Sequence, residues 1–422
     1  MINVKELGNT VFAGKAKPAS GGGGSDNAAN KDLSNLSASG EAKLAGEEWQ
    51  KPAEWVDIRS GALPNSVYML VGHSADYSTY PTLPIKASVS NSGTYDVYID
   101  GIKQFSAVAS GTESTITWQT LALTSGRDVT YPAALKTHIV RVTPTSSSNE
   151  LTALSCGATT VKGILWVHFT TTEAISLYQL LTATGAVWAD RAPVCQAITS
   201  DNGELEVTSL SGAFNFIKNL IELPVFIGKG NTYADRISTS DSFRYCTGIK
   251  KIKFKDLYCS DSYGLFRECN SLQEVSLENS HIAIADYSFA NCFALKKLPS
   301  PLPISSLASN SVLALSALEP TFIDFSDGTT ATKVDAHGTS GHTMYGLKGL
   351  TVSSSAPFSS STSPQINVSY TGLDRSALVH LFNSMPTVTD SQVINVTGCT
   401  GAASLTAEDL AIATEKGWTV TR

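Results

Sequence analysis

The chain has 422 residues, of which 42% are hydrophobic and only 16% charged, and its formal net charge is −7. This length allows about two to four domains, and the low charged fraction is typical of β-rich, turn-rich proteins. The acidic balance argues against a nucleic-acid footprint, and no apolar run reaches the length of a membrane helix, so we expect neither nucleic-acid binding nor membrane insertion.

Residues 1–50 have the composition of an extended attachment segment. Four consecutive glycines at 21–24 indicate a flexible linker. Residues 30–44 hold too few apolar side chains for a core of their own, so they are expected to order only against a partner or copies of themselves. The first twenty residues lack the apolar core of a signal peptide.

Residues 51–170 are predicted to form a β-sandwich. Apolar and polar side chains alternate in Tyr95–Ile99, Thr115–Trp118 and His138–Val142, as expected for half-buried strands. Asp100-Gly101 follows the first run and is a tight-turn signal. The apolar run Ile164–Phe169 is expected to close the sandwich or lead to the next domain.

Residues 171–370 are predicted to form a solenoid, which begins after a junction with an expected helix at Glu173–Leu181. A pattern of Phe-x-x-Cys-x-x-Leu/Ile recurs every 23 residues. Looser copies precede the regular ones by 29 residues and follow them, the last after a step of 32 residues. The regular units are Phe243, Cys246, Ile249, Ile252, Phe254; Phe266, Cys269, Leu272, Val275, Leu277; and Phe289, Cys292, Leu295, Leu298. The looser units are Phe214, Ile217, Leu220, Leu223, Val225; Val312, Leu315, Leu318, Ile323; and Met344, Leu347, Leu350, Val352.

The spacing inside each unit changes from three residues to two, as expected where a tight turn gives way to a strand. One unit cannot bury its apolar side chains alone, so neighbouring units must stack and share a core. In such a stack Cys246, Cys269 and Cys292 form a ladder of small buried thiols. The odd total of seven cysteines, with no Cys-x-x-Cys pair, argues against a disulfide framework and against a zinc cluster.

Residues 371–422 are predicted to form an α/β cap on the open end of the solenoid. Leu378, Leu381 and Phe382 have helical spacing within Asp374–Met385, and Val393–Val396 is a predicted strand. Thr406, followed by two acidic residues, is expected to cap a helix that runs to Lys416. Gly417 then ends the helix before a last strand at 418–420.

The register of Phe266 to Leu277 resembles the BspA-type leucine-rich repeat of bacterial surface proteins and phages. The segment Asn30–Lys43 is similar to repeats near the attachment ends of phage tail fibres. Together these resemblances imply a multidomain, mainly β phage tail-fibre or receptor-binding protein. They imply a virion (tail) location, host adhesion through the repeats and no enzymatic activity. A tail or baseplate protein would bind the N-terminus, a host surface glycan or protein would bind the repeats, and the chain would form a homo-oligomer, for example a trimer.

Candidate host-contact residues lie in two places. Lys251, Lys253 and Lys255 alternate with inward Ile252 and Phe254, so they either guard a solvated strand or form a basic stripe for anionic glycan. The other candidates, His337, His342 and Tyr345, lie in or beside a polar loop, where the histidines either are ordinary loop residues or bind a metal. We assign no catalytic, cofactor or metal residue, because no nucleotide-binding or hydrolase motif is present.

Three other functions are compatible with the sequence. A bacterial surface adhesin of the same repeat family would need an export signal or anchor. A structural virion protein would have no receptor role. A glycan-degrading tail enzyme would need two carboxylates across a cleft. The tyrosines and tryptophan of the expected sandwich form either core or a sugar-binding platform, and they are Tyr68, Tyr77, Tyr80, Tyr95, Tyr98 and Trp118.

Overall fold

The computed structural model gives a mainly β chain, as predicted. The described residues are 49–73, 83–117, 127–131, 133–156, 163–181, 195–228, 236–280, 282–284, 288–289, 292, 294–295, 304–307, 321–324, 334–335, 347–352 and 363–422. They divide into two compact units. Unit one holds the residues up to Ile227 together with Cys246–Lys250, and unit two holds Gly228–Tyr245 and Lys251–Arg422. The predicted domain limits at 50, 170 and 370 stay predictions.

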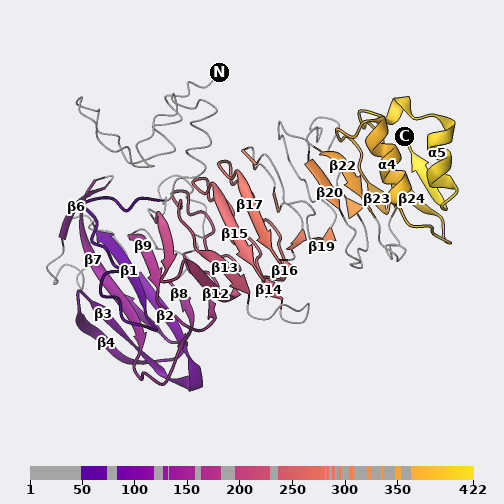
Figure 1. Ribbon diagram of the computed structural model, residues 1–422. Coiled ribbons are helices and arrows are strands. Elements are labelled where there is room, and N and C mark those ends of the chain that lie inside the picture. Colours follow the sequence, from indigo (N-terminus) through magenta and orange to yellow (C-terminus); the bar gives the residue numbers. More distant parts are fainter. Residues whose placement is uncertain are drawn as a thin grey trace, which may run out of the picture. The chain divides into compact units, whose positions relative to one another are not determined.

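Unit one contains two sheets, drawn from indigo to magenta in Figure 1. The first has the strand order β11-β9-β1-β7-β3-β4, with β6 paired to β7. Its strands are β1 (Val67–His73), β3 (Thr94–Ile99), β4 (Ile102–Ala109), β6 (Arg127–Tyr131), β7 (Ala133–Pro144), β9 (Ile164–Phe169) and β11 (Ala197–Ser200). The second sheet has the order β13-β12-β10-β8-β2-β5 within this unit. Its strands are β2 (Leu83–Val89), β5 (Glu113–Ile116), β8 (Leu151–Ser155), β10 (Ile175–Ser176), β12 (Glu204–Ser209) and β13 (Val225–Gly228).

The strands expected around Tyr95–Ile99, His138–Val142 and Ile164–Phe169 are all present as β3, β7 and β9. The tight turn at Asp100-Gly101 is also present, with φ of 50° and 82° at its two residues. For the predicted run Thr115–Trp118, the strand in the structure is Glu113–Ile116, and Trp118 lies outside the described residues. Tyr95 links the two sheets, because its hydroxyl donates to the carbonyl of Thr112 (2.6 Å) and also lies 3.0 Å from the Ile85 carbonyl on β2.

Strand pairing changes from antiparallel to parallel partway through unit one. β1, β3 and β7 pair antiparallel, whereas β11 pairs parallel to β9. In the second sheet β2 and β8 are antiparallel, whereas β10 is parallel to both β8 and β12. In a solenoid each repeat forms one coil of the chain, and all coils run in the same direction. Neighbouring strands of stacked coils are therefore parallel. Coil geometry therefore begins near residue 175.

The helix predicted at Glu173–Leu181 is wrong. That segment holds the two-residue strand β10 followed by turns. Its backbone N–H groups donate to backbone carbonyls of the next coil and not along a helix. Leu177 donates to Ser209, Gln179 to Ser211, and Leu181 to Ala213. Pairing with a neighbouring strand overrode the local helical preference.

One register prediction is also wrong. Leu223 and Val225 were expected to face the core, but Pro224 and Phe226 are the buried residues there. The Phe226 ring lies 6.0 Å from that of Phe214, as the Phe254 ring lies 6.3 Å from that of Phe243. This coil therefore holds one residue more between its two phenylalanines, and a shift of one residue exchanges the two faces of a strand.

In unit two the described strand pairs are all parallel. β14 pairs with β16, β15 with β17, β18 with β19, and β20 with β22, and a four-stranded sheet has the order β21-β23-β24-β25. These strands are β14 (Ile237–Ser238), β15 (Lys251–Lys255), β16 (Cys259–Asp261), β17 (Glu274–Glu278), β18 (Ile282–Ile284), β19 (Ile304–Leu307), β20 (Thr321–Asp324), β21 (Val334–Asp335), β22 (Leu347–Thr351), β23 (Ile366–Asn367), β24 (Gln392–Asn395) and β25 (Trp418–Thr421).

The predicted 23-residue period is visible in the backbone itself. Left-handed residues recur at this interval: Asp241 and Gly264, Tyr245 and Glu268, and Asp256 and Asn279. The Phe243, Phe266 and Phe289 rings stack in sequence, with centroids 5.8 Å and 5.2 Å apart. The inward positions of the regular units that the structure describes are buried, except for half-buried Leu277. Leu298, Val312, Leu315, Leu318 and Met344 lie outside the described residues.

The repeat cysteines are buried, as predicted, and each makes a directed contact as well. The Cys246 thiol donates to the Phe214 carbonyl of the preceding coil at 2.9 Å. Cys269 donates likewise to Phe243 at 2.9 Å, and Cys292 to Phe266 at 3.0 Å. The thiol therefore adds a hydrogen bond between neighbouring coils, at a carbonyl that in Phe214 and Phe266 also accepts a backbone N–H from its own turn.

The C-terminal segment contains the predicted helices and strands (Figure 1). α4 (Arg375–Ser384) is capped by Asp374, and α5 (Ala407–Thr414) begins with a capping box between Thr406 and Asp409. The second helix ends two residues before the predicted Lys416. Gly417, with φ of 88°, then leads into β25.

The C-terminal segment also repeats the coil contacts. Ile366 and Asn367 pair in register with Ile394 and Asn395, a step of 28 residues. Cys399 donates its thiol hydrogen to the Val368 carbonyl at 3.0 Å, as the earlier repeat cysteines do. The sequence prediction treated this region as a separate kind of cap and missed its repeat.

Replacing Cys269 with alanine tests the thiol contact. We expect a loss of about 1–3 kcal/mol in the free energy of unfolding, because the hydrogen bond from the thiol to the Phe243 carbonyl is lost inside the core. The matched control is Cys156→Ala, since the Cys156 thiol is equally buried but lies against the Met69 sulfur at 3.8 Å. Chemical denaturation measures both variants. An equal loss in the two would mean that the thiols contribute volume alone.

Acid stability tests the contact between the two C-terminal helices. Arg375 binds Asp409 through two nitrogens, at 2.7 Å and 3.2 Å, and lowers the pKa of that carboxyl from 3.8 to about 2. A depressed folded pKa gives stability that is present above the unfolded value and lost as pH falls toward 2. The thermal midpoint of the wild type should therefore fall more steeply from pH 5 to pH 2 than that of Asp409→Asn. Parallel slopes would contradict this assignment.

Candidate recognition surface

Strand β15 places the three candidate lysines as the alternation predicted. Lys251 and Lys253 are exposed, Lys255 is half-buried, and Ile252 and Phe254 point into the core. The 23-residue step brings β17 alongside, so that Lys251 lies opposite Glu274 and Lys255 opposite Glu278. The lysine face is therefore shared with glutamates of the next coil.

Ion pairs join the two strands. Lys251 Nζ lies 2.9 Å from Glu274 Oε2, and Lys253 Nζ lies 2.7 Å from Glu278 Oε2. Lys253 lowers the pKa of the Glu278 carboxyl through this hydrogen bond. The surface is a ladder of alternating charge and not the basic stripe that the lysines alone suggest. The signal was in the sequence, because adding 23 to 251 and to 255 leads to Glu274 and Glu278, whereas Lys253 leads to Ser276.

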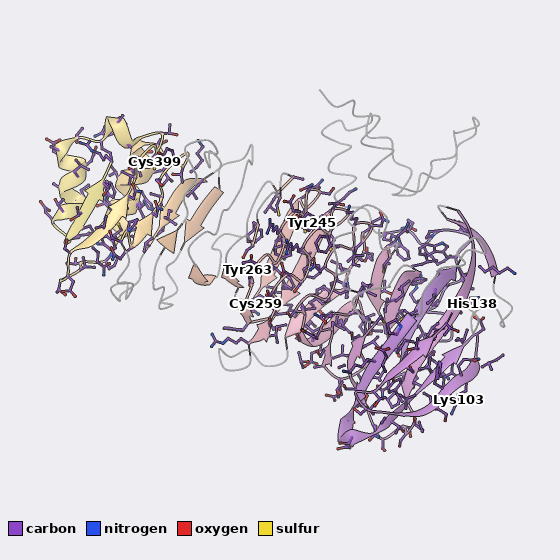
Figure 2. The ribbon with its side chains drawn as sticks, turned by 180° about the vertical axis from the view of Figure 1, so that it is seen from behind. Lys103, His138, Tyr245, Cys259, Tyr263 and Cys399 are labelled. Atoms are coloured by element: carbon purple, nitrogen blue, oxygen red, sulfur yellow. The ribbon has the colours of Figure 1, made fainter. Side chains whose placement is uncertain are left out.

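The turns of the same coils carry a second group of polar and aromatic side chains, one of them exposed and the others half-buried, which the sequence prediction did not identify. Tyr263 is 37% exposed, and Figure 2 shows it and Tyr245 within these coils. Arg244 lies 3.5 Å from Asp241 Oδ1, and its guanidinium carbon lies 5.4 Å from the Tyr245 ring centroid. The left-handed backbone at Asp241 and Tyr245 orients this group.

The turn side and the β15–β17 ladder present both signs of charge, phenolic hydroxyls and aromatic rings. Such a mixture can form hydrogen bonds and ion pairs with a polar partner, because the groups are held by a stacked core and remain accessible. The glutamates and tyrosines arise from positions that the repeat leaves free, so they can differ from coil to coil without disturbing the packing.

The cysteines of the coils are unsuited to chemistry at neutral pH. Burial raises the pKa of Cys259 to about 12 and that of Cys292 to about 12, so both thiols stay protonated. Burial also raises the pKa of Cys246. A protonated thiol is a poor nucleophile and a poor metal ligand.

The remaining candidates, His337, His342 and Tyr345, lie outside the described residues. Within the described ranges, no group of three or more histidine, cysteine or acidic residues is arranged to hold a metal ion. None of the described helices is long and apolar enough to cross a membrane.

Comparison with protein families matches residues 235–331 to the model described as BspA type leucine rich repeat region (6 copies). The match covers about a quarter of the chain and includes β15, β17 and the three consecutive Phe-Cys coils. The resemblance to this repeat type is therefore supported for residues 235–331. Comparison with curated proteins gave no match, and comparison with solved structures gave none either.

Charge reversal at the ladder should leave stability almost unchanged. We expect Lys253→Glu to shift the thermal unfolding midpoint by no more than about 2 °C, because exposed ion pairs contribute little to folding. The inward neighbour gives the contrast: Phe254→Ala should lower the midpoint by much more, since its ring is fully buried. Differential scanning fluorimetry distinguishes the two, and a large loss from Lys253→Glu would assign the ladder a structural role.

Proposed function

We propose that the protein is a phage tail-fibre or receptor-binding protein that adheres to the surface of a host bacterium through its leucine-rich repeats. The proposal rests on the observation that the buried and the exposed positions of the coils hold different kinds of side chain. Phenylalanines and thiols fill the inside of each coil, while the exposed strand face holds Lys251, Lys253, Glu274 and Glu278. A surface of this kind can be altered for recognition at little cost to folding.

The match to the BspA-type repeat supports an adhesive role at the level of the repeat family. The phage assignment rests on the likeness of Asn30–Lys43 to tail-fibre attachment repeats. In the proposed arrangement residues 1–50 dock to a tail or baseplate protein, and the chain forms a homo-oligomer. Many weak contacts are then multiplied by copy number. The role is one of binding, without a catalytic step.

A bacterial surface adhesin is the second candidate function, and the family match supports this candidate without bearing on the phage assignment. Fractionation separates the two. Mass spectrometry of purified virions should find the chain in the tail if the phage assignment holds. Recovery from the cell envelope of a bacterium, without a phage particle, would support the adhesin instead.

Adhesion is tested with the full chain, because the first coils and the N-terminal sheets belong to one compact unit. Fluorescently labelled protein is incubated with a panel of bacterial strains, and binding is measured by flow cytometry. On a strain that binds the wild type, Lys251→Glu combined with Lys253→Glu should reduce binding at least tenfold, because it reverses the charge of the two exposed lysines that pair with Glu274 and Glu278.

The control is Lys86→Glu, which makes one such charge reversal on an exposed position of β2. It should bind cells like the wild type. Full binding by the double variant and by Tyr263→Ala would show that neither side of the coils recognises the host, and the proposal for the repeats would fail.

A further inference from the structure

A buried histidine lies where the first sheet of unit one changes from antiparallel to parallel pairing. Strand β9 pairs antiparallel with β1, its neighbour in Figure 1, and parallel with β11. His168 on β9 is in register with Thr199 on β11, and its side chain is completely buried. A titratable group in this position can make the pairing of the two strands depend on pH.

Both ring nitrogens of His168 have hydrogen-bond partners. Nδ1 lies 3.0 Å from Thr199 Oγ1, and Nε2 lies 3.0 Å from Asp201 Oδ1. The Thr199 hydroxyl also accepts the indole N–H of Trp166 at 2.8 Å. Because an indole nitrogen only donates, the hydrogen of this hydroxyl is directed to His168 Nδ1. A neutral imidazole with its hydrogen on Nε2 therefore completes the network, and each hydrogen in it has an acceptor.

Trp166 connects this network to residues 49–62, the segment before β1, which we call the strap. The Trp49 ring meets the Trp166 ring edge-on, with centroids 5.2 Å apart, and the Arg59 guanidinium carbon lies 5.2 Å from the Trp166 ring centroid. Trp55 belongs to the same buried cluster as Trp166. The tryptophan that holds the strap is therefore also the one that orients the Thr199 hydroxyl.

A second proton on the imidazole does not fit this network. With hydrogen on Nδ1, His168 and Trp166 would both donate to the Thr199 oxygen, and the hydrogen of that hydroxyl would lose its acceptor. The cation would also be completely buried, which costs free energy. Asp201 favours the cation, but its side chain is 56% exposed, so water screens the attraction.

The other titratable and charged groups that face His168 come from the strap and from β1. Arg59 opposes the cation, and it binds Asp57 through two nitrogens at 2.9 Å and 2.7 Å. The registered neighbour on β1 is Tyr68, which is uncharged at neutral pH. Burial is the largest influence and lowers the pKa of His168, against the opposing effect of Asp201.

The direction of this shift fixes the sign of the pH dependence. When the folded pKa of a histidine is lowered, its contribution to stability is complete above the unfolded value of about 6.5. That contribution is lost as the pH falls from this value toward the folded one, because the unfolded or opened state takes up the proton first. Mild acid therefore opposes the arrangement around His168.

We propose that His168 is a proton-sensitive latch, whose protonation in mild acid breaks its hydrogen bond with Thr199 and releases the strap from Trp166. The device lies within unit one and does not depend on the proposed role of the repeats. Opening is reversible, because no covalent bond changes. It exposes the tryptophans that the strap and the sheet bury together.

Tryptophan fluorescence and far-UV circular dichroism of the full chain test the proposal, in a titration from about pH 7.5 to about pH 4.5. The wild-type emission should shift reversibly to longer wavelength as Trp49, Trp55 and Trp166 become hydrated, while the circular dichroism is retained. His168→Asn, which does not titrate, should show no such shift. The control is His380→Asn, the same replacement at an exposed histidine of α4, and it should behave like the wild type.

Asp201→Asn gives a second test on an exposed side chain, and it decides the matter if His168→Asn does not fold. The midpoint of the emission change should move to lower pH by about half a unit or more, because the carboxylate that stabilises the imidazolium is removed. The latch is overturned by a wild-type emission that does not change, by an equal change in His168→Asn, or by an unmoved midpoint in Asp201→Asn. Loss of far-UV circular dichroism together with the emission change would also overturn it, since that would be general unfolding in acid.

Discussion

Each coil of this protein depends on the next one to satisfy its polar backbone groups. Turns with left-handed residues leave N–H groups and carbonyls that cannot pair within a single coil, and an unpaired buried group costs free energy. The neighbouring coil supplies the partners: the Tyr245 N–H donates to the backbone carbonyl of Arg267, and the Phe243 N–H donates to that of Leu265. The thiols of Cys246, Cys269 and Cys399 add further hydrogen bonds to carbonyls of the preceding coil. Stacking is therefore required by hydrogen bonding as well as by burial of the phenylalanines.

Three features of the molecule follow from this requirement. Coil geometry can start directly from the antiparallel sheets, because β8 and β9 offer open edges to β10 and β11. The chain can end in helical coils of a different length, provided that a thiol and a strand remain in place. The exposed residues of β15 and β17 contribute little to the stability of the fold, so the coil surface is a suitable place for recognition.

The spacing of phenylalanine and cysteine was enough to predict the coils, since a fixed interval of apolar residues reports shared burial directly. Prediction from the local sequence pattern failed where contacts with a neighbouring coil determine the secondary structure or the buried face. The apolar residues of 173–181 suit a helix, but their N–H groups pair with the next coil. Phe226 replaced Val225 in the core because one added residue before the strand reverses its faces. The left-handed turns at Asp241 and Tyr245 could not be predicted, because no glycine marks these positions in the sequence.

The central claim is that folding and recognition are divided between the inward and outward positions of the same coils. A paired mutational scan of residues 251–278, scored once for protein abundance and once for binding to cells, tests this most directly. The account predicts that inward positions such as Phe254 and Cys269 control abundance, while outward positions such as Lys253 and Glu274 control binding at normal abundance. Outward substitutions that reduce abundance as strongly as inward ones, or that leave binding intact throughout the segment, would contradict it.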